Sequence, residues 1–244
     1  MTPIKLSIII PALNEEKLLP VLLESIEKQD FKNYEIIVAD AQSKDKTKQI
    51  AENYGCQIVA GGTPPVSRNN AAKSARGEYL LFLDSDVKLP KMFLKKLIGK
   101  VEKKGIEICS CWFNPLSRRC DDFLIHHFFN CYNYSTQFFY PHAPGYCIFA
   151  KKEIHEKISG FNENLLMGED HDYVKRAAKF GKFKSLFTPQ IFVSVRRYDS
   201  DGRLNVFLKY TCYEFYRWIN GDKKTKIFKY EFNHHKQNDN KKSK

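Results

Sequence analysis

Two aspartates separated by one residue, in Asp84-Ser85-Asp86, could hold a hard cation, because both carboxylates can reach one ion where the chain bends. They directly follow Tyr79–Leu83, a short apolar run typical of a buried strand. A structural alternative is an acid pair in a turn or a helix N-cap, since Pro90 and a helical pattern come next. The position at a strand end favours the cation-binding interpretation.

A second group of acids, Glu169, Asp170 and Asp172, opens a predicted helix over residues 169–180. Acids in a first turn are stabilised by the helix dipole, which is the structural interpretation for at least two of them. The functional interpretation is that one carboxylate is a general base that takes a proton from a hydroxyl group. His171 could ligate a metal, although a histidine on a helix surface is the more common outcome.

Asp40 and Arg68 are further polar candidates near predicted strand ends. Asp40 follows the apolar run 36–39 and could accept hydrogen bonds from a base or a ribose. Its structural alternative is an Asx turn, with Ser43 or Asp45 capping the next helix. Arg68, beside Asn69, could place a guanidinium on a diphosphate, or could be a solvated helix charge.

The elements that must position these residues alternate in the first half of the chain. Apolar runs predict strands over 6–10, 35–39, 57–60 and 79–83. Helical spacing predicts helices over 15–29, 46–54 and 66–75, the last capped by Gly77. This order predicts βαβ units and a mainly parallel sheet. Ligands of such sheets bind outside the carboxyl ends of strands, where Asn14, Asp40 and residues 84–86 lie.

The second half is less regular. We expect an amphipathic helix that buries Leu94, Leu97, Ile98 and Val101, then strands over 106–113 and 145–150, a strand-like run over 191–195, and helices over 169–180 and 204–219. Residues 121–140 are unusually aromatic and receive no assignment. From Gly221 onward lysine, asparagine and histidine dominate, and we expect fraying or disorder. The chain is therefore predicted to form one domain with a C-terminal appendage.

Composition limits the class of protein. The 244 residues are 43% hydrophobic and 28% charged, which is a globular composition rather than a disordered or collagen-like one. No apolar run approaches the ~20 residues of a membrane-spanning helix, and no signal peptide begins the chain. Seven cysteines without paired spacing, including the Cys109 and Cys111 pair that fits no structural zinc site, predict reduced thiols in the cytoplasm. The net charge of +12 permits nucleic acid, phosphorylated ligands or anionic membrane as partners.

Taken in order, these segments resemble glycosyltransferase family 2 over roughly residues 4 to 200. The resemblance is carried by Ile-Ile-Ile-Pro-Ala-Leu-Asn-Glu-Glu at residues 8–16, the acidic turn at 38–47, and Arg68-Asn69-Asn70 leading through 77–79 into the DxD motif at 84–86. It continues through residues 144–149 and 160–163 to the ED motif of Gly168-Glu169-Asp170. Each motif is weak alone, and the ordered set is specific.

The resemblance implies an α/β fold of the GT-A type, with a Rossmann-like, mainly parallel central sheet flanked by helices and a C-terminal helical appendage. The catalytic domain would span 1–203, with a nucleotide-binding half of about 1–113 and an acceptor-side half of about 114–203. Residues 204–244 would form an amphipathic helix and a basic tail.

The implied reaction is an inverting transfer from a nucleoside-diphosphate sugar, with Mg²⁺ or Mn²⁺ held by Asp84 and Asp86. Asp170, next to Glu169, would be the general base, and Arg196 and Arg197 would contact phosphate or acceptor. Donor contacts would come from the strand-end loops: Pro11, Leu13, Asn14, Glu15, Asp40, Ser43, Arg68, Asp84, Ser85 and Asp86.

Two departures from the family pattern affect this expectation. Ala41 stands where the family often has a second acid, so Asp40 is the only acid of that turn. Processive members carry a Gln-x-x-Arg-Trp motif, whereas this chain reads Ser194-Val195-Arg196-Arg197-Tyr198. The second departure predicts transfer of one sugar rather than polymer synthesis.

Other functions compete with this reading. A nucleotidyltransferase would need a Gly-rich phosphate loop after the first strand, and residues 11–14 are not one. A basic module could bind nucleic acid or anionic membrane without catalysis, but no nucleic-acid motif accompanies the lysines. A catalytically silent relative is disfavoured because both acidic motifs are intact. We expect no nucleic acid, an acceptor that is a sugar, a glycan or a lipid-linked group, and a homodimer as a further candidate.

The last predicted helix carries an apolar stripe that contains Leu208, Phe215 and Trp218. It either packs on the catalytic core or, with the lysine-rich tail of 221–244, binds the cytoplasmic face of an anionic membrane. A third alternative is a dimer interface.

Overall fold

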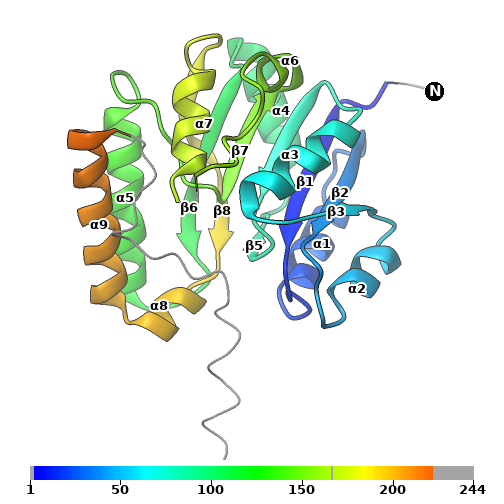
Figure 1. Ribbon diagram of the computed structural model, residues 1–244, viewed down its shortest axis with the longest axis horizontal. Helices are drawn as coiled ribbons and strands as arrows, with labels where there is room; N and C mark the ends of the chain where they lie inside the picture. Colours follow the sequence, from blue (N-terminus) through cyan, green and yellow to red (C-terminus); the bar gives the residue numbers. More distant parts are fainter. Residues whose placement is uncertain (1–2, 166, 222–244) are drawn as a thin grey trace, which may run out of the picture.

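The structure is a computed structural model that describes residues 3–165 and 167–221 (Figure 1). Within these residues one eight-stranded sheet is formed by β1 (Leu6–Ala12), β2 (Tyr34–Asp40), β3 (Gln57–Ala60), β4 (Tyr79–Leu83), β5 (Val87–Lys88), β6 (Ile108–Pro115), β7 (Cys147–Lys151) and β8 (Phe183–Val193). The strand order is β3-β2-β1-β4-β7-β6-β8-β5. The four strands β3-β2-β1-β4 are parallel to their neighbours, as are β6 and β8. β7 is antiparallel to both β4 and β6, and β5 to β8.

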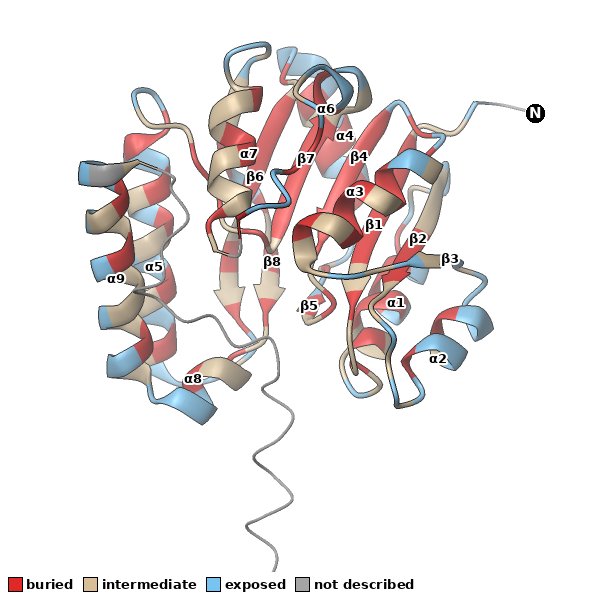
Figure 2. Ribbon diagram, viewed as in Figure 1, coloured by how far each residue is buried: buried red, intermediate tan, exposed pale blue. Residues whose placement is uncertain are grey.

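Helices cover both faces of the sheet. The described helices are α1 (Leu19–Glu27), α2 (Thr47–Asn53), α3 (Pro64–Ser74), α4 (Phe93–Lys104), α5 (Cys120–Thr136), α6 (Lys152–Lys157), α7 (Glu169–Ala177), α8 (Arg196–Asp201) and α9 (Arg203–Asn220). Ile8 and Ile10 of β1 pack with α1 and α4 on one face, and Ile9 packs with α3, α6 and α7 on the other. The central strands are therefore buried on both sides, which explains their uninterrupted apolar runs (Figure 2).

The mainly parallel α/β sheet predicted from the sequence is confirmed, and β3 and β4 have the predicted bounds. The first helix begins at Leu19 rather than at residue 15, because residues 15–18 form a turn and Pro20 stands in the first helical turn. The helix of the second acidic motif ends at Ala177, since the amides of Phe180 and Gly181 turn back onto the Ala177 carbonyl.

Gly77 does not cap α3, contrary to the sequence prediction. The helix ends at Ser74, and Ala75 already has an extended backbone. A Cβ on Gly77 would lie 2.5 Å from the Ser7 amide nitrogen, and the Gly77 amide donates to the Ser7 hydroxyl at 2.8 Å. The glycine is required for the close approach of this turn to β1.

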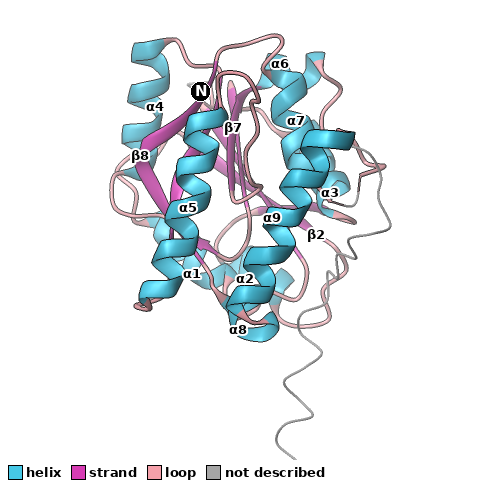
Figure 3. Ribbon diagram, turned by 90° about the vertical axis from the view of Figure 1, so that its left-hand side faces the viewer, coloured by secondary structure: helices cyan, strands magenta, loops and turns pink. Residues whose placement is uncertain are grey.

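The aromatic segment that received no assignment forms α5, which lies side by side with α9 (Figures 1 and 3). Arg203 at the start of α9 bonds to Asp122 at the start of α5, at 2.8 Å. Near the far ends Tyr132 donates to Glu214 at 3.2 Å. These contacts join start to start and end to end, so the two helices are parallel.

The apolar stripe of α9 faces outward, so the interpretation that it packs on the catalytic core is wrong. Leu208, Phe215 and Trp218 are 50%, 70% and 54% exposed. The inward side instead buries Tyr213 and Arg217. The reason is that the neighbouring α5 turns polar residues inward, among them Asp122, His126 and Asn130, and Arg203 at the start of α9 pairs with Asp122 at 2.8 Å.

Two further predictions concern the C-terminal part of the chain. The division at 203 and 204 stays a prediction, although α9 contributes to the same cavity wall as the preceding domain. The basic tail of 222–244, predicted to fray, lies outside the described residues. Among residues 3–165 and 167–221 no helix is both long and apolar enough to cross a membrane. The thiols of Cys109 and Cys111 are free and buried in the core, and burial keeps the pKa of the Cys109 thiol well above its usual range.

The buried imidazole of His155 makes stability depend on pH. It packs against Phe82, with its Nδ1 3.1 Å from the Tyr173 hydroxyl, and burial together with the Arg176 charge lowers its pKa to about 4. Because the unfolded chain takes up the proton near pH 6.5 and the folded chain does not, the stabilisation present above pH 6.5 should be lost as the pH falls to about 4. The loss at this site is about 3 kcal/mol in the free energy of unfolding.

Urea unfolding at several pH values checks this, with His155→Gln expected to remove that part of the pH dependence. His127→Gln, at an exposed ring on α5, is the matched control and should leave the slope intact. If the free energy of unfolding depends on pH equally in the parent protein and in His155→Gln, the pH dependence does not come from His155.

Candidate active site

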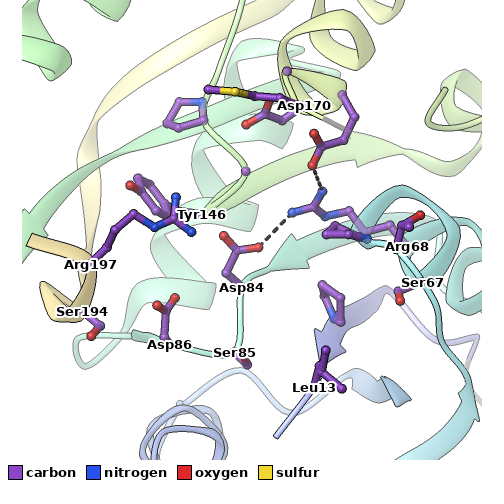
Figure 4. Close-up of a pocket in the computed structure, with 18 of the residues that line it drawn as sticks. Leu13, Ser67, Arg68, Asp84, Ser85, Asp86, Tyr146, Asp170, Ser194 and Arg197 are labelled. Atoms are coloured by element: carbon purple, nitrogen blue, oxygen red, sulfur yellow. Dashed lines mark hydrogen bonds and ion pairs between the residues drawn. The ribbon is translucent and has the colours of Figure 1, made fainter. Parts of the chain in front are cut away.

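A cavity of about 600 Å³ opens at the carboxyl ends of β1 and β4 (Figure 4). One wall comes from the loops after β1, β2, β3 and β4, and the other from the start of α7, the end of β8 and the inner sides of α5 and α9. The predicted site residues that line it are Pro11, Leu13, Glu15, Arg68, Asp84, Ser85, Asp86, Glu169, Asp170, Arg196 and Arg197. Both acidic motifs therefore face one space.

The acids of the DxD segment end β4 and are held by arginines. Asp84 accepts a hydrogen bond from Arg68 at 2.9 Å, and Asp86 lies 3.3 Å from the Arg196 Nε. Burial raises the pKa of Asp86 to about 7, against the opposing charge of Arg196. The helix-cap alternative is wrong, since α4 begins only at Phe93, and Met92 is its N-cap residue.

Arg68 on α3 is the buried link between the two acidic motifs. One terminal nitrogen donates to Asp84 and the other to Glu169, each at 2.9 Å (Figure 4). A Cβ on Gly145 would lie 2.8 Å from this guanidinium, so a side chain there would have to displace a group that two ion pairs hold. The solvated-charge alternative for Arg68 is therefore wrong.

The neighbouring Asn69 has a different role. Its amide nitrogen donates to the Phe161 carbonyl and to Glu163, and its oxygen accepts from the Phe161 amide. It thereby fastens α3 to the segment that precedes α7.

Glu169 and Asp170 begin α7 at the cavity wall. Burial raises the pKa of both carboxyl groups above their usual range, and the Arg68 charge opposes this rise. Such carboxylates hold a proton more readily than exposed ones, which suits a general base. Gly168, at φ 76°, precedes them, and a Cβ there would lie 2.2 Å from the Tyr213 hydroxyl. That hydroxyl donates to the Met167 carbonyl at 3.0 Å, so α9 helps to position the start of α7.

Arg196 and Arg197 follow β8 and both line the cavity. Arg196 donates two hydrogen bonds to Glu15, at 2.8 and 2.5 Å, and so joins the loop after β1 to the start of α8. Arg197 bonds to Tyr210 of α9 and lies beside Tyr146 (Figure 4). Both arginines therefore contact side chains of other elements in the cavity wall.

Three predicted donor contacts do not line the cavity: Asn14, Asp40 and Ser43. The backbone amide of Asn14 donates a hydrogen bond to the Ser43 hydroxyl at 2.9 Å, which joins the loops after β1 and β2. Asp40 accepts from the Ser43 amide at 3.1 Å, the turn interaction offered as its structural alternative. Its other oxygen, Oδ1, is buried and has no hydrogen-bond partner among the described residues. Ala41 and Gln42 line the cavity beside it.

The sequence analysis missed the contribution of α5 and α9 to the cavity. Tyr132, Tyr213 and Glu214 line it, and Glu214 lies 3.4 Å from the His171 Nε2, which is itself 3.8 Å from Asp170. The many aromatic residues in 121–140 were the one sequence signal for this contribution. No spacing rule connects that segment with Tyr213 and Glu214 of α9. His171 belongs to no metal cluster, because within the described residues no three His, Cys, Asp or Glu side chains gather closely enough.

The cavity wall carries carboxylates and guanidinium groups together. Its carboxylates are Glu15, Asp84, Asp86, Glu169, Asp170 and Glu214, against the guanidinium groups of Arg68, Arg196 and Arg197. The acids outnumber the arginines, so a cation would be attracted, and the arginines provide donors for phosphate or carboxylate.

Comparison with known sequences gives a consistent result. A family model described as "Glycosyl transferase family 2" matches residues 7–158, more than half of the chain. Poly(ribitol-phosphate) beta-N-acetylglucosaminyltransferase TarS of Staphylococcus aureus is 40% identical over 114 residues, which are 43% of this chain and 20% of that protein. GalNAc(5)-diNAcBac-PP-undecaprenol beta-1,3-glucosyltransferase of Campylobacter jejuni is 36% identical over 108 residues, 41% of this chain and 35% of that protein. The chain thus spans well under two thirds of these relatives.

Solved structures share the fold. The crystal structure of S. aureus TarS 1–349 in complex with UDP-GlcNAc has a TM-score of 0.63 and 24% identity, and the match covers 78% of this chain and 58% of that one. Mannosyltransferase PcManGT from Pyrobaculum calidifontis, in complex with GDP-Man and Mn²⁺, has a TM-score of 0.66 and 19% identity, covering 85% and 64%.

Replacing Arg68 by methionine should destabilise the fold. The change leaves Asp84 and Glu169 without their shared partner, and breaking a buried ion pair on one side costs about 3 kcal/mol or more. Chemical denaturation measures the loss. Arg119→Met, which breaks the exposed pair with Asp121, is the control and should change stability far less. Equal effects of the two substitutions would show that the Arg68 pairs contribute nothing beyond surface ion pairs.

Proposed function

This chain belongs to glycosyltransferase family 2, and on that premise we propose that it transfers one sugar from a nucleoside-diphosphate sugar to an acceptor, with inversion at the anomeric carbon. The observation that carries the proposal is that the acids after β4 and those opening α7 face each other across one cavity. Its GT-A type α/β fold supports the same conclusion. Family membership favours this reaction over nucleotidyl transfer and over a binding module without catalysis.

The donor would bind at the ends of β1 to β4. TarS and PcManGT were solved with UDP-GlcNAc and GDP-Man, which supports a nucleotide sugar as donor for this chain also. We assign the buried Oδ1 of Asp40 to the base or the ribose, because a buried acceptor atom without a partner is costly unless a ligand donates to it. Asn14 and Ser43 would act indirectly, by fixing the loops around the nucleotide.

The residues at the end of β4 fit a divalent cation. Asp84 and Asp86 line the cavity with hard carboxylate oxygens, and the wall carries more carboxylates than guanidinium groups. We propose that Asp86 coordinates Mg²⁺ or Mn²⁺ directly and that Asp84 contacts the ribose or the water shell of the ion. A cation bound there would neutralise charge on the departing diphosphate.

On the acceptor side Asp170 would take the proton from the attacking hydroxyl group. Glu169 accepts a hydrogen bond from Arg68. Among the described residues, the carboxylate of Asp170 accepts one only from the backbone amide of the next residue, His171, at 2.8 Å. An acceptor that is a lipid phosphate is already ionised and needs no base, and Asp170 would then orient a cation or the acceptor instead. Arg197, whose guanidinium lies beside Tyr146, is our candidate for a phosphate contact, while Arg196 mainly holds Glu15 and Asp86.

The remaining partners are also proposals. The absence of the Gln-x-x-Arg-Trp motif at 194–198 supports transfer of a single sugar. We propose that the acceptor is carried at the cytoplasmic face of an anionic membrane. The alternative for the exposed apolar stripe of α9 is a homodimer interface.

Asp86→Asn should weaken metal-dependent nucleotide binding by about tenfold or more, because one ligand charge is lost. Calorimetry with UDP and with GDP, each with Mn²⁺ and with chelator, measures this. Unchanged affinity of the parent protein in chelator would remove the cation from the proposed mechanism.

Asp170→Asn should lower transfer to a hydroxyl acceptor by about 10² or more, because the amide cannot take the proton. Donor binding should persist, and stability should fall by less than ~1 kcal/mol because the amide oxygen can still accept a hydrogen bond. Asp172→Asn, two residues further along α7 and paired with Arg176 outside the cavity, is the matched control and should retain transfer. A parallel loss of melting temperature and activity in Asp170→Asn would favour a purely structural role.

A further inference from the structure

The most exposed of the described residues on α5 and α9 carry no charged side chain. The exposed residues of α5 are Cys120, Phe123, Leu124, His127, Phe128, Cys131, Tyr134 and Ser135. Those described on α9 are Leu204, Asn205, Leu208, Cys212, Phe215, Trp218 and Ile219. None is Asp, Glu, Lys or Arg. We call these fifteen residues the helix-pair face.

A helix elsewhere in this chain shows the usual pattern. The exposed residues of α4 are Lys95, Lys96, Gly99, Glu102, Lys103 and Lys104, as expected of a helix that faces water. The helix-pair face has the opposite composition, with Leu124 and Phe215 exposed by 71% and 70%. An exposed apolar surface of this extent indicates an interaction site.

The face is continuous across the two helices. Phe128 of α5 and Phe207 of α9 have ring centroids 5.3 Å apart, and Phe139, just after α5, lies 6.3 Å from Trp218. Figure 3 looks onto the two helices side by side. Phe138, at the end of α5, is 72% exposed and extends the apolar surface.

Ion pairs on the inner side fix this orientation. Arg203 bonds to the fully buried Asp122, and Arg217, 1% exposed, bonds to Glu214. Rotating α9 to bury its apolar side would break the pair between Arg203 and Asp122 and leave a buried carboxylate without its partner, which is costly. The apolar side therefore stays outward in the folded protein.

We propose that the helix-pair face is a membrane-binding surface that lies in the interface of an anionic bilayer. Aromatic and aliphatic side chains on helices parallel to a surface suit insertion at the headgroup level. Basic residues border the face: exposed Arg118 and Arg119 before α5, and Lys184, whose Nζ lies 4.3 Å from the Phe138 ring centroid. The neighbouring acid Asp121 is paired with Arg119 and Arg203.

The sequence directly after α9 adds to the same charge. Residues 222–244 contain eight lysines and three acids, and each basic residue near an anionic leaflet contributes about 1 kcal/mol of attraction. The net charge of +12 disfavours a second copy as the occupant, because two copies of the chain repel each other.

This orientation would place the active site at the membrane. The inner sides of the same helices contribute Tyr132, Tyr213 and Glu214 to the cavity wall, so one helix layer of about 10 Å separates the bilayer from the cavity. A lipid-linked acceptor would then be delivered along the membrane plane; this step alone rests on the proposed function.

Cosedimentation of the full chain with vesicles of equal parts phosphatidylcholine and phosphatidylglycerol tests the surface. Binding should weaken as salt is added, because salt screens the lysines. Leu124→Glu combined with Phe215→Glu should reduce binding by about tenfold or more, since two inserted apolar groups become charges. Tyr54→Glu, at the end of α2 across the molecule, is the control and should bind as the parent does.

Tryptophan quenching gives an independent readout. Brominated lipid should quench the parent protein, and Trp218→Phe should lose most of that quenching while Trp112 remains. Equal vesicle binding by the double variant and the parent, or no vesicle binding at low salt, overturns the proposal. A dimer in solution that the double variant dissociates, without vesicle binding, assigns the face to a second copy and also overturns it. None of these measurements uses a sugar donor, so they separate failure of the surface from failure of the reaction.

Discussion

The arrangement of this protein depends on neutralising carboxylates that distant segments bring to one cavity. Arg68 is bonded at once to Asp84 and to Glu169, which lies 101 residues further along the chain. Arg196 does the same for Glu15 and Asp86. Because an unpaired buried charge is expensive, these two arginines hold the acidic motifs at fixed positions before any ligand binds. Arg68 and Arg196 therefore hold the shape of the site, and both also line the cavity.

Close backbone approach is the second condition that this charge network requires. The loop before β7 passes the Arg68 guanidinium at Gly145, and the start of α7 passes the Tyr213 hydroxyl at Gly168. A side chain at either position would collide with a group that positions the acids. These glycines therefore allow the loop before β7 and the start of α7 to lie close to Arg68 and Tyr213.

The helix pair α5 and α9 has two sides of different composition. Its inner side is polar and carries Asp122, Glu214 and Arg217 against the cavity and the partner helix. Its outer side carries the apolar residues, which reverses the pattern of α4. A hydrophobic stripe on a helix therefore indicates an interface, but the polarity of the neighbouring surface decides whether that interface lies within the protein or outside it.

The sequence by itself determined the parallel strands, the position of both acidic motifs at element ends and the family. These follow from local signals: β-branched runs that cannot face water, and acids that directly follow or begin an element. Tertiary structure decided the rest. The pairing of Arg68 with two motifs, the indirect role of Asn14 and Ser43, the place of Glu214 in the cavity wall and the outward side of α9 all depend on contacts between residues far apart in the chain. Helical periodicity gives the angle between side chains on one helix, and it carries no information about which side the rest of the protein covers.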